Sequence, residues 1–245
     1  MESGTINDMS RPRIHIPADR WKPRLVLGDS EHRHLVSVLR LEPGEQVEVF
    51  DGQGHVCRAE LIREGRQWLL GLGPREYRPD NLLSVHLGIA LLKGKKLDSV
   101  VRMATEVGVA SIRIFTCARS VPRADARRMQ QRLRRFENIA SESARQSCRS
   151  SVPAVRPLSS FEEIVSGDLP LFCALLHESA GGRPLTDLLI DAGPERMLLV
   201  GPEGGFTSEE AEMAGQKGFH VARLDLPVLR AETAAVVAAA LACLP

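Results

Sequence analysis

The chain has 245 residues, of which 43% are hydrophobic and 26% are charged, values ordinary for a globular protein with one large domain or two modest ones. No apolar run approaches the roughly 20 residues of a membrane helix, so we expect neither a membrane span nor a secretory signal at Met1 to Arg11. Five scattered cysteines without a C-x-x-C pair, and histidines without a metal motif, predict free thiols, a cytoplasmic location and no metal.

Net charge is only +1, but the charges are unevenly distributed along the chain. Residues 93–156 carry 15 basic and 5 acidic side chains, whereas residues 157–245 carry 5 basic and 13 acidic ones. The basic middle segment is compatible with a face that binds a polyanion such as RNA. Charge alone equally allows a solvated basic helix.

Short strands and turns are predicted for the first part of the chain. The apolar spacing between His32 and Leu41 predicts one short helix that ends before Pro43. Asp51-Gly-Gln-Gly54 is a strong hairpin signal between two of the strands. The predicted strands are 13–16, 25–27, 46–50, 56–62 and 68–72. We therefore expect a small β-rich, barrel-like module, followed by a polar linker over residues 73–81.

Strands and helices alternate from residue 84 onward. The predicted strands are 85–92, 111–116, 171–176 and 197–200, and the predicted helices are 97–107, 124–149, 207–218 and 231–244. Gly108 is placed as a helix C-cap, and Thr207-x-x-Glu210 forms a capping box. This alternation predicts an α/β domain with a mainly parallel sheet. The last helix is nearly apolar all round, which implies burial in the core or against a second subunit.

Two stretches near the C-terminus indicate a ligand site. In Gly201-Pro-Glu-Gly-Gly-Phe206 a buried strand runs into a loop with three glycines and then into a capped helix. Glycines let backbone atoms approach a ligand, and ligands of α/β proteins sit at the carboxyl ends of parallel strands. In Leu229-Arg-Ala-Glu-Thr-Ala234 a strand passes into the last helix. Glu232 and Thr233 fit ordinary capping positions, but Arg230 just before the helix could meet an anionic base.

These two stretches, with others in the same order, resemble the RsmE-type uridine-N3 methyltransferases of the SPOUT superfamily. The resemblance covers residues 11 to 244. Its further motifs are the R-x-x-x-I-P segment at Arg13, His34 to Gly44, Val49-Phe-Asp-Gly52, Leu92-Lys-Gly-Lys-Lys96, Ala104-Thr-Glu-Val-Gly-Val109, Arg119-Ser120 and Glu142 to Arg149. The chain departs from the family pattern at Asp225 and Pro227, where a glycine and an arginine are expected.

The resemblance implies a fold, a reaction and partners. It implies a PUA-like β-barrel RNA-binding domain over residues 11–76 and a SPOUT methyltransferase domain with a trefoil knot over residues 82–245. The implied reaction is S-adenosyl-L-methionine-dependent methylation of uracil N3 in 16S ribosomal RNA of the small ribosomal subunit. A homodimer is also implied.

Matching the motifs residue by residue assigns roles to particular side chains. The chemistry of the reaction, rather than a motif, assigns Arg230 to stabilising the uracil anion, and Glu232 and Glu203 are both candidates for the general base. The cofactor is expected at Leu176, His177, Glu178, Val200, Gly201, Pro202, Glu203, Gly204, Gly205, Leu224, Leu226, Leu229 and Thr233. RNA is expected at Arg13, Arg40, Lys93, Lys95, Lys96, Arg119, Gln146 and Arg149.

Three other functions compete with this interpretation. A ribose 2′-O-methyltransferase of the same superfamily usually carries S-L-N-x-S-x-A where this chain has LRAETA. A non-catalytic RNA-binding assembly factor would use only the β-module and the basic helix. An NAD-dependent enzyme would need G-x-G-x-x-G, which this chain lacks.

Overall fold

The computed structural model describes residues 11–80, 83–120, 126–178 and 181–245. They form two compact units, one of residues 11–80 with Ala144–Val152, and the other of the described residues between 83 and 143 and between 153 and 245. The predicted lead-in up to residue 10, the end of the predicted linker at residue 81 and the start of the predicted helix at residues 124–125 lie outside the described residues.

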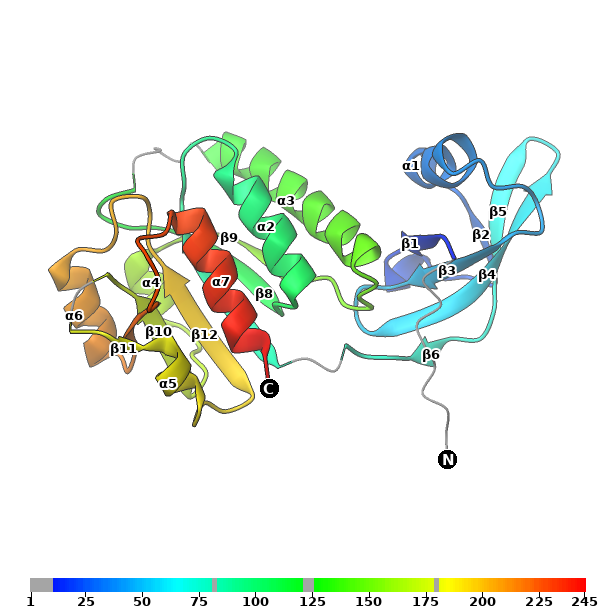
Figure 1. Ribbon diagram of the computed structural model, residues 1–245. Helices are drawn as coiled ribbons and strands as arrows, with labels where there is room; N and C mark the ends of the chain where they lie inside the picture. The colour runs from blue at the N-terminus through cyan, green and yellow to red at the C-terminus, as the bar shows by residue number, and fades with distance from the viewer. Residues whose placement is uncertain (1–10, 81–82, 121–125, 179–180) are drawn as a thin grey trace, which may run out of the picture. The chain divides into compact units, whose positions relative to one another are not determined.

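The first unit is built on a six-stranded sheet (Figure 1). Its elements are β1 (Arg13–His15), η1 (Ala18–Arg20), β2 (Arg24–Val26), α1 (Asp29–His32), the π-helical η2 (Arg33–Val38), β3 (Gln46–Phe50), β4 (His55–Glu64), β5 (Gln67–Leu72) and β6 (Glu76–Tyr77). The order is β1-β3-β4-β5-β2, and β6 pairs with β4. Among the strand pairs described for this sheet, β1 and β3 are parallel and all the others are antiparallel.

The predicted hairpin between β3 and β4 is confirmed, with Phe50 opposite Val56. Two predictions for this unit need correction. The helix expected from His32 begins earlier, at Asp29, and changes to π-helical geometry from Arg33 to Val38. The segment expected to be a plain linker contains β6, because its residues 76 and 77 pair with β4.

Residues 144–152 complete the first unit. Oδ2 of Asp80 accepts a hydrogen bond from Nε of Arg149 at 2.9 Å, and its Oδ1 accepts one from the backbone amide of Ser150 at 2.8 Å. The amide of Val152 donates to the carbonyl of Gly52 at 2.9 Å. Both Arg149 and Asp80 are largely buried, so this segment is an integral part of the unit.

In the described residues the second unit is an α/β domain with seven strands, all of them parallel, where a mainly parallel sheet was predicted (Figure 1). Its strands are β7 (Ser84–Ala90), β8 (Ser111–Thr116), β9 (Ala154–Ser160), β10 (Phe172–Leu176), β11 (Arg183–Pro184), β12 (Glu195–Val200) and β13 (His220–Arg223). Its helices are α2 (Lys96–Val107), α3 (Ala126–Gln146, which runs into the first unit), α4 (Phe161–Ser166), α5 (Leu185–Leu189), α6 (Ser208–Gln216) and α7 (Ala231–Cys243). The strand order is β11-β13-β10-β12-β7-β8-β9.

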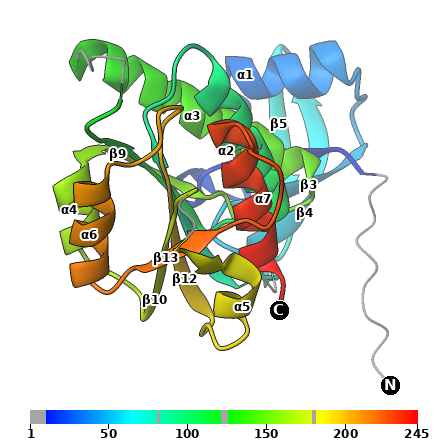
Figure 2. The same cartoon turned by 60° about the vertical axis from the view of Figure 1, so that its left-hand side comes forward.

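Helices cover both faces of this sheet. Figure 2 shows α4 and α6 on one face and α2 and α7 on the other. On the α4 and α6 face, Phe161 and Phe206 pack with Phe115 and with apolar strand residues in one buried cluster. Helix α7 packs against α2, β7 and β12, and its side chains Ala235, Ala238, Ala239 and Ala242 are buried. The burial predicted from its apolar sequence is therefore confirmed, in the core of this domain.

Candidate functional site

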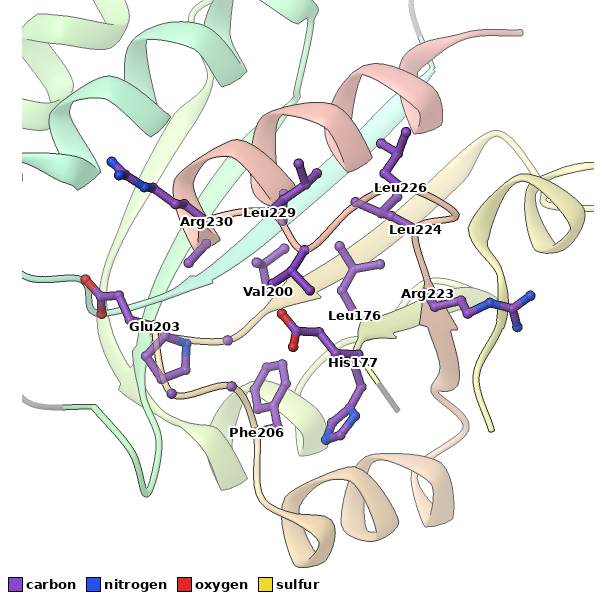
Figure 3. Close-up of a pocket in the computed structure, with 18 of the residues that line it drawn as sticks. Leu176, His177, Val200, Glu203, Phe206, Arg223, Leu224, Leu226, Leu229 and Arg230 are labelled. Atoms are coloured by element: carbon purple, nitrogen blue, oxygen red, sulfur yellow. The ribbon is translucent and has the colours of Figure 1, made fainter. Parts of the chain in front are cut away.

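A cavity of about 1020 Å³ lies where β10, β12 and β13 end. Figure 3 shows its lining side chains between the glycine-containing loop and the approach to α7. It is lined by Lys96, Arg119, residues 176–178, residues 200–206, residues 223–231 and Ala234. Because the three strands are adjacent and parallel, their carboxyl ends bring segments far apart in the sequence to one place.

The glycine-containing loop, residues 201–206, forms one wall of this cavity. It turns tightly, with the amide of Gly205 donating to the carbonyl of Pro202 at 2.9 Å. Gly205 has φ +67°, a left-handed conformation that favours glycine. The loop ends at Phe206, which is buried and stacks on Phe115 with a centroid distance of 6.2 Å. The capping box follows, because Thr207 and Glu210 exchange hydrogen bonds as predicted.

The facing wall is the irregular segment of residues 224–230 before α7; the prediction of a strand that leads directly into this helix is wrong, because β13 ends at Arg223. Leu226 and Val228 are 52% and 83% exposed, so the rim of the cavity is apolar on this side. Asp225, at the position where the family pattern has glycine, accepts a hydrogen bond from Nε of Arg223 at 2.8 Å. Arg230 is exposed, occupies the N-cap of α7 and makes no ion pair within the described part of the chain. Its guanidinium is therefore available to a ligand.

Three charged residues from three separate motifs meet beside the cavity. Nζ of Lys96 lies 2.8 Å from Oε1 of Glu203 and 3.5 Å from Oε2 of Glu232. Burial acts to raise the pKa of Glu203, but the hydrogen bond from Lys96 and those from backbone amides outweigh it and lower that pKa. The same hydrogen bond raises the pKa of Lys96. Both groups are consequently ionised at neutral pH.

A second cation holds the same loop by its backbone. Nη1 of Arg119 donates to the carbonyl oxygens of Gly204 at 2.8 Å and Phe206 at 3.2 Å. Next to it, the amide of Ala118 donates to Oε1 of Glu210 at 2.7 Å. The turn after β8 is thereby fastened to the loop and to the start of α6.

Most of the residues that the family resemblance assigns to the cofactor line this cavity. Thr233 does not line it and is exposed on the first turn of α7. Of the two residues assigned to catalysis, Arg230 lines the cavity, whereas Glu232 does not line it and faces Lys96. The residues assigned to a cofactor that do line it are Leu176, His177, Glu178, Val200, Gly201, Pro202, Glu203, Gly204, Gly205, Leu224, Leu226 and Leu229.

Sequence reasoning missed two lining residues, Arg223 and Ala234. The position of Arg223 at the end of a parallel strand could have identified it, but the short strand β13 was not predicted. Ala234 lies one turn of helix from Arg230, so helical spacing alone gave the signal.

Apart from Lys96, which is partly buried and pairs with Glu203, the residues predicted to contact RNA fall into two groups. Arg40, Lys93, Lys95, Arg119 and Gln146 are exposed. Arg13 and Arg149, in contrast, are buried in the first unit, where Arg13 pairs with Glu48 at 2.7 Å and Arg149 with Asp80. A contact of either with RNA would require it to exchange that partner.

Comparison with known proteins identifies the class to which this fold and cavity belong. The family model for an RNA methyltransferase domain matches residues 79–243, and that for an RNA methyltransferase PUA domain matches residues 27–67. No helix in the described ranges is long and apolar enough to cross a membrane. Within the same ranges, no group of three or more His, Cys, Asp or Glu residues could hold a metal ion.

Similarity to individual proteins places the chain in a narrower group within the RNA methyltransferases. Ribosomal RNA small subunit methyltransferase E from Mycobacterium bovis is 32% identical over 222 residues, 87% of this chain and 83% of that protein. A methyltransferase from Legionella pneumophila, solved with the cofactor SAM, superimposes with a TM-score of 0.86 at 28% identity, covering 95% of this chain and 96% of that one. The methyltransferase E from Neisseria gonorrhoeae, bound to S-adenosyl methionine, gives 0.82 at 26% identity over 94% and 95%.

The chain therefore belongs to the RNA methyltransferase family. Within it, the chain is a member of the ribosomal RNA small subunit methyltransferase E family, the RsmE-type enzymes of the SPOUT superfamily.

Proposed function

We propose that this enzyme transfers the methyl group of S-adenosyl-L-methionine to N3 of a uridine in 16S ribosomal RNA. One observation carries the proposal: the loops of residues 176–178, 201–206 and 224–230, which the family motifs assign to cofactor and catalysis, border a single cavity. The relatives from Legionella and Neisseria hold SAM, which supports the same cofactor for this chain.

The cavity has the size and chemistry that the cofactor requires. Its volume of about 1020 Å³ lies at the upper end of the usual range for small-molecule sites. Leu176, Val200, Leu224 and Leu229 offer apolar walls for an adenine ring. The glycine-containing loop presents backbone amides and carbonyls, which can bind the polar groups of the ribose and the amino acid.

The bound cofactor supplies an electrophilic methyl group on a positively charged sulfur. Uracil N3 becomes nucleophilic only as its proton leaves, and the negative charge then spreads to the carbonyl oxygens O2 and O4. Arg230, exposed at the cavity and not engaged in an ion pair with any described residue, stabilises that charge. Holding N3 in line with the methyl carbon and sulfur contributes the remainder through orientation.

Glu232 is the better of the two candidate proton acceptors. Its Oε2 atom is buried and faces Nζ of Lys96 at 3.5 Å, a longer contact than the 2.8 Å that the same nitrogen makes with Glu203. Glu203, in contrast, already accepts hydrogen bonds from Lys96 and from the amide of Lys93, and these contribute to its lowered pKa. A lowered pKa makes a carboxylate a weaker base.

RNA binding is assigned to exposed basic side chains, to the neutral side chain of Gln146 and to the PUA domain. Arg40, Lys93, Lys95 and Gln146 are available to phosphate oxygens, and contacts of this kind fix the position of an RNA without reading its sequence. We extend the proposal to a cytoplasmic homodimer with a trefoil knot in the methyltransferase domain, on the basis of family membership. The domain limits proposed from the motifs are residues 11–76 and 82–245.

Transfer of a labelled methyl group tests this function. Small ribosomal subunits that lack methylation are incubated with the enzyme and methyl-labelled S-adenosylmethionine, and radioactivity in 16S RNA is counted. We expect labelled RNA with the native enzyme and none with Arg230→Ala. Cofactor binding without labelling of any subunit or free RNA would refute the substrate, and absence of cofactor binding would refute the enzyme function itself.

A further inference from the structure

Lys96 differs from the other lysines of its motif in its surroundings. The turn of residues 93–96 contains three lysines, all of which the sequence predicts to contact RNA. Lys93 and Lys95 are exposed, and neither side chain pairs with an acidic residue of the described chain. Lys96 instead bonds to Glu203 and also faces Glu232, which are 107 and 136 positions further along the chain.

We propose that Lys96 is a positioning residue of the methyltransferase site rather than an RNA contact. Its ammonium joins the glycine-containing loop, through Glu203, to the first turn of α7, through Glu232, and so fixes the two walls of the cavity relative to each other. The proposal rests on the proposed function, because its consequences are measured with the cofactor of that function.

The geometry at Glu203 explains how one lysine can fix a loop. Oε1 of Glu203 accepts a hydrogen bond from Nζ of Lys96 at 2.8 Å and a longer one from the amide of Lys93 at 3.4 Å. The start of α2 is thereby tied to the middle of the loop by two bonds to one oxygen. Only one of the two depends on the lysine side chain, so its removal loosens the loop without releasing it.

Electrostatics explain why both walls depend on this cation. Glu203 and Glu232 carry the same charge, and the side chains of Lys96, Glu203 and Glu232 are 33%, 29% and 16% exposed. At such partly buried positions two carboxylates repel more strongly than in water, unless a cation lies between them. Lys96 supplies that cation, with its ammonium 2.8 Å from Glu203 and 3.5 Å from Glu232.

The test compares Lys96→Gln with Lys95→Gln, the neighbouring exposed lysine, in the full-length protein. Calorimetry measures the affinity for S-adenosylhomocysteine, and a fluorescent 16S RNA fragment reports RNA affinity at several salt concentrations. We expect Lys96→Gln to weaken nucleoside binding about fivefold or more and to change RNA affinity less than about twofold. Lys95→Gln should do the opposite and reduce the slope of log affinity against log salt by about 0.7 to 0.9, the contribution of one phosphate contact.

Three further variants separate positioning from general damage. Lys96→Arg, which keeps the charge and the donors, should restore cofactor affinity to within about twofold. Glu203→Gln should weaken it as Lys96→Gln does, and the double variant should be no worse than either alone. In steady state, Lys96→Gln should raise KM for S-adenosylmethionine while KM for RNA is unchanged. Melting temperatures verify that each variant is folded, and Glu203→Gln serves as the test if Lys96→Gln is not.

The outcomes distinguish a failure of the proposed function from a failure of the positioning role of Lys96. If the native enzyme does not bind the nucleoside, the proposed function fails and the role of Lys96 with it. If the native enzyme binds and Lys96→Gln binds equally well but loses RNA affinity and one phosphate contact of salt dependence, Lys96 contacts RNA and the positioning role is wrong.

Discussion

Arg119 donates a hydrogen bond to the carbonyl oxygen of Gly204 over 2.8 Å, although the two residues are 85 positions apart in the chain. The same nitrogen also bonds the carbonyl of Phe206. A guanidinium that holds two carbonyls of a cavity wall restricts how far that loop can move. This contact connects the turn after β8 to the wall of the cavity.

Arg119→Met should weaken cofactor binding. A hydrogen bond from a charged donor contributes roughly 1.5–3 kcal/mol when buried, and we take about 1 kcal/mol here because Arg119 is exposed, which corresponds to about a fivefold loss of affinity. Calorimetry with S-adenosylhomocysteine measures it. The control is Arg102→Met, which removes an exposed arginine from α2 that does not line the cavity. Equal affinities in both variants would mean that the hydrogen bonds from Arg119 to the loop have no role in cofactor binding.

Gly205→Ala should affect both stability and binding, whereas Gly218→Ala should affect stability alone. Both glycines have positive φ, +67° and +91°, and at both a Cβ would meet open space. The cost of alanine is therefore a backbone cost in each case, about 1 kcal/mol of unfolding free energy. Gly205 is in the cavity wall and Gly218 follows α6. Thermal melting and calorimetry separate the effects, and unchanged affinity in Gly205→Ala would show that the loop tolerates another conformation.

Acid should destabilise the first unit partly through Asp80. Burial acts to raise the pKa of Asp80, but hydrogen bonds from Ser150 and Arg149 lower it below the ordinary value of 3.8. Because the folded pKa is the lower one, its contribution to stability is present above pH 3.8 and is lost as pH falls through the folded pKa. Asp80→Asn should cost about 1–3 kcal/mol at neutral pH and flatten the acid dependence below pH 3.8.

Denaturant unfolding followed by Trp fluorescence measures this, since Trp21 and Trp68 both lie in the first unit. Asp19→Asn, at an exposed aspartate of the same unit, is the control and should leave stability and its acid dependence unchanged. If Asp80→Asn has the native stability at neutral pH, residues 144–152 do not depend on this carboxylate for their attachment.

Local patterns predicted much of the fold. The hairpin at Asp51, the C-cap at Gly108 and the capping box at Thr207 depend on neighbouring residues only, and all three are present. The strand β9 was missed because Pro157 and exposed polar residues interrupt its apolar pattern. The strands β11 and β13 are too short, at two and four residues, to show a period.

Pairing between distant segments was less accessible to sequence reasoning. The cavity-lining loops were found because family motifs mark them, but the bonds of Lys96 to Glu203 and of Arg149 to Asp80 join residues 107 and 69 positions apart. The sequence shows the charge of a lysine, but it does not indicate which carboxylate the lysine contacts in the folded protein. For the same reason the attachment of residues 144–152 to the first unit could not be foreseen.

The identity of the methylated atom decides whether this enzyme is a uridine-N3 methyltransferase. Small subunits lacking methylation are treated with the enzyme and S-adenosylmethionine, and the 16S RNA is digested to nucleosides and separated by mass spectrometry. We expect N3-methyluridine with the native enzyme and its loss in Arg230→Ala. A ribose-methylated nucleoside, or a methylated base other than N3-methyluridine, would contradict it.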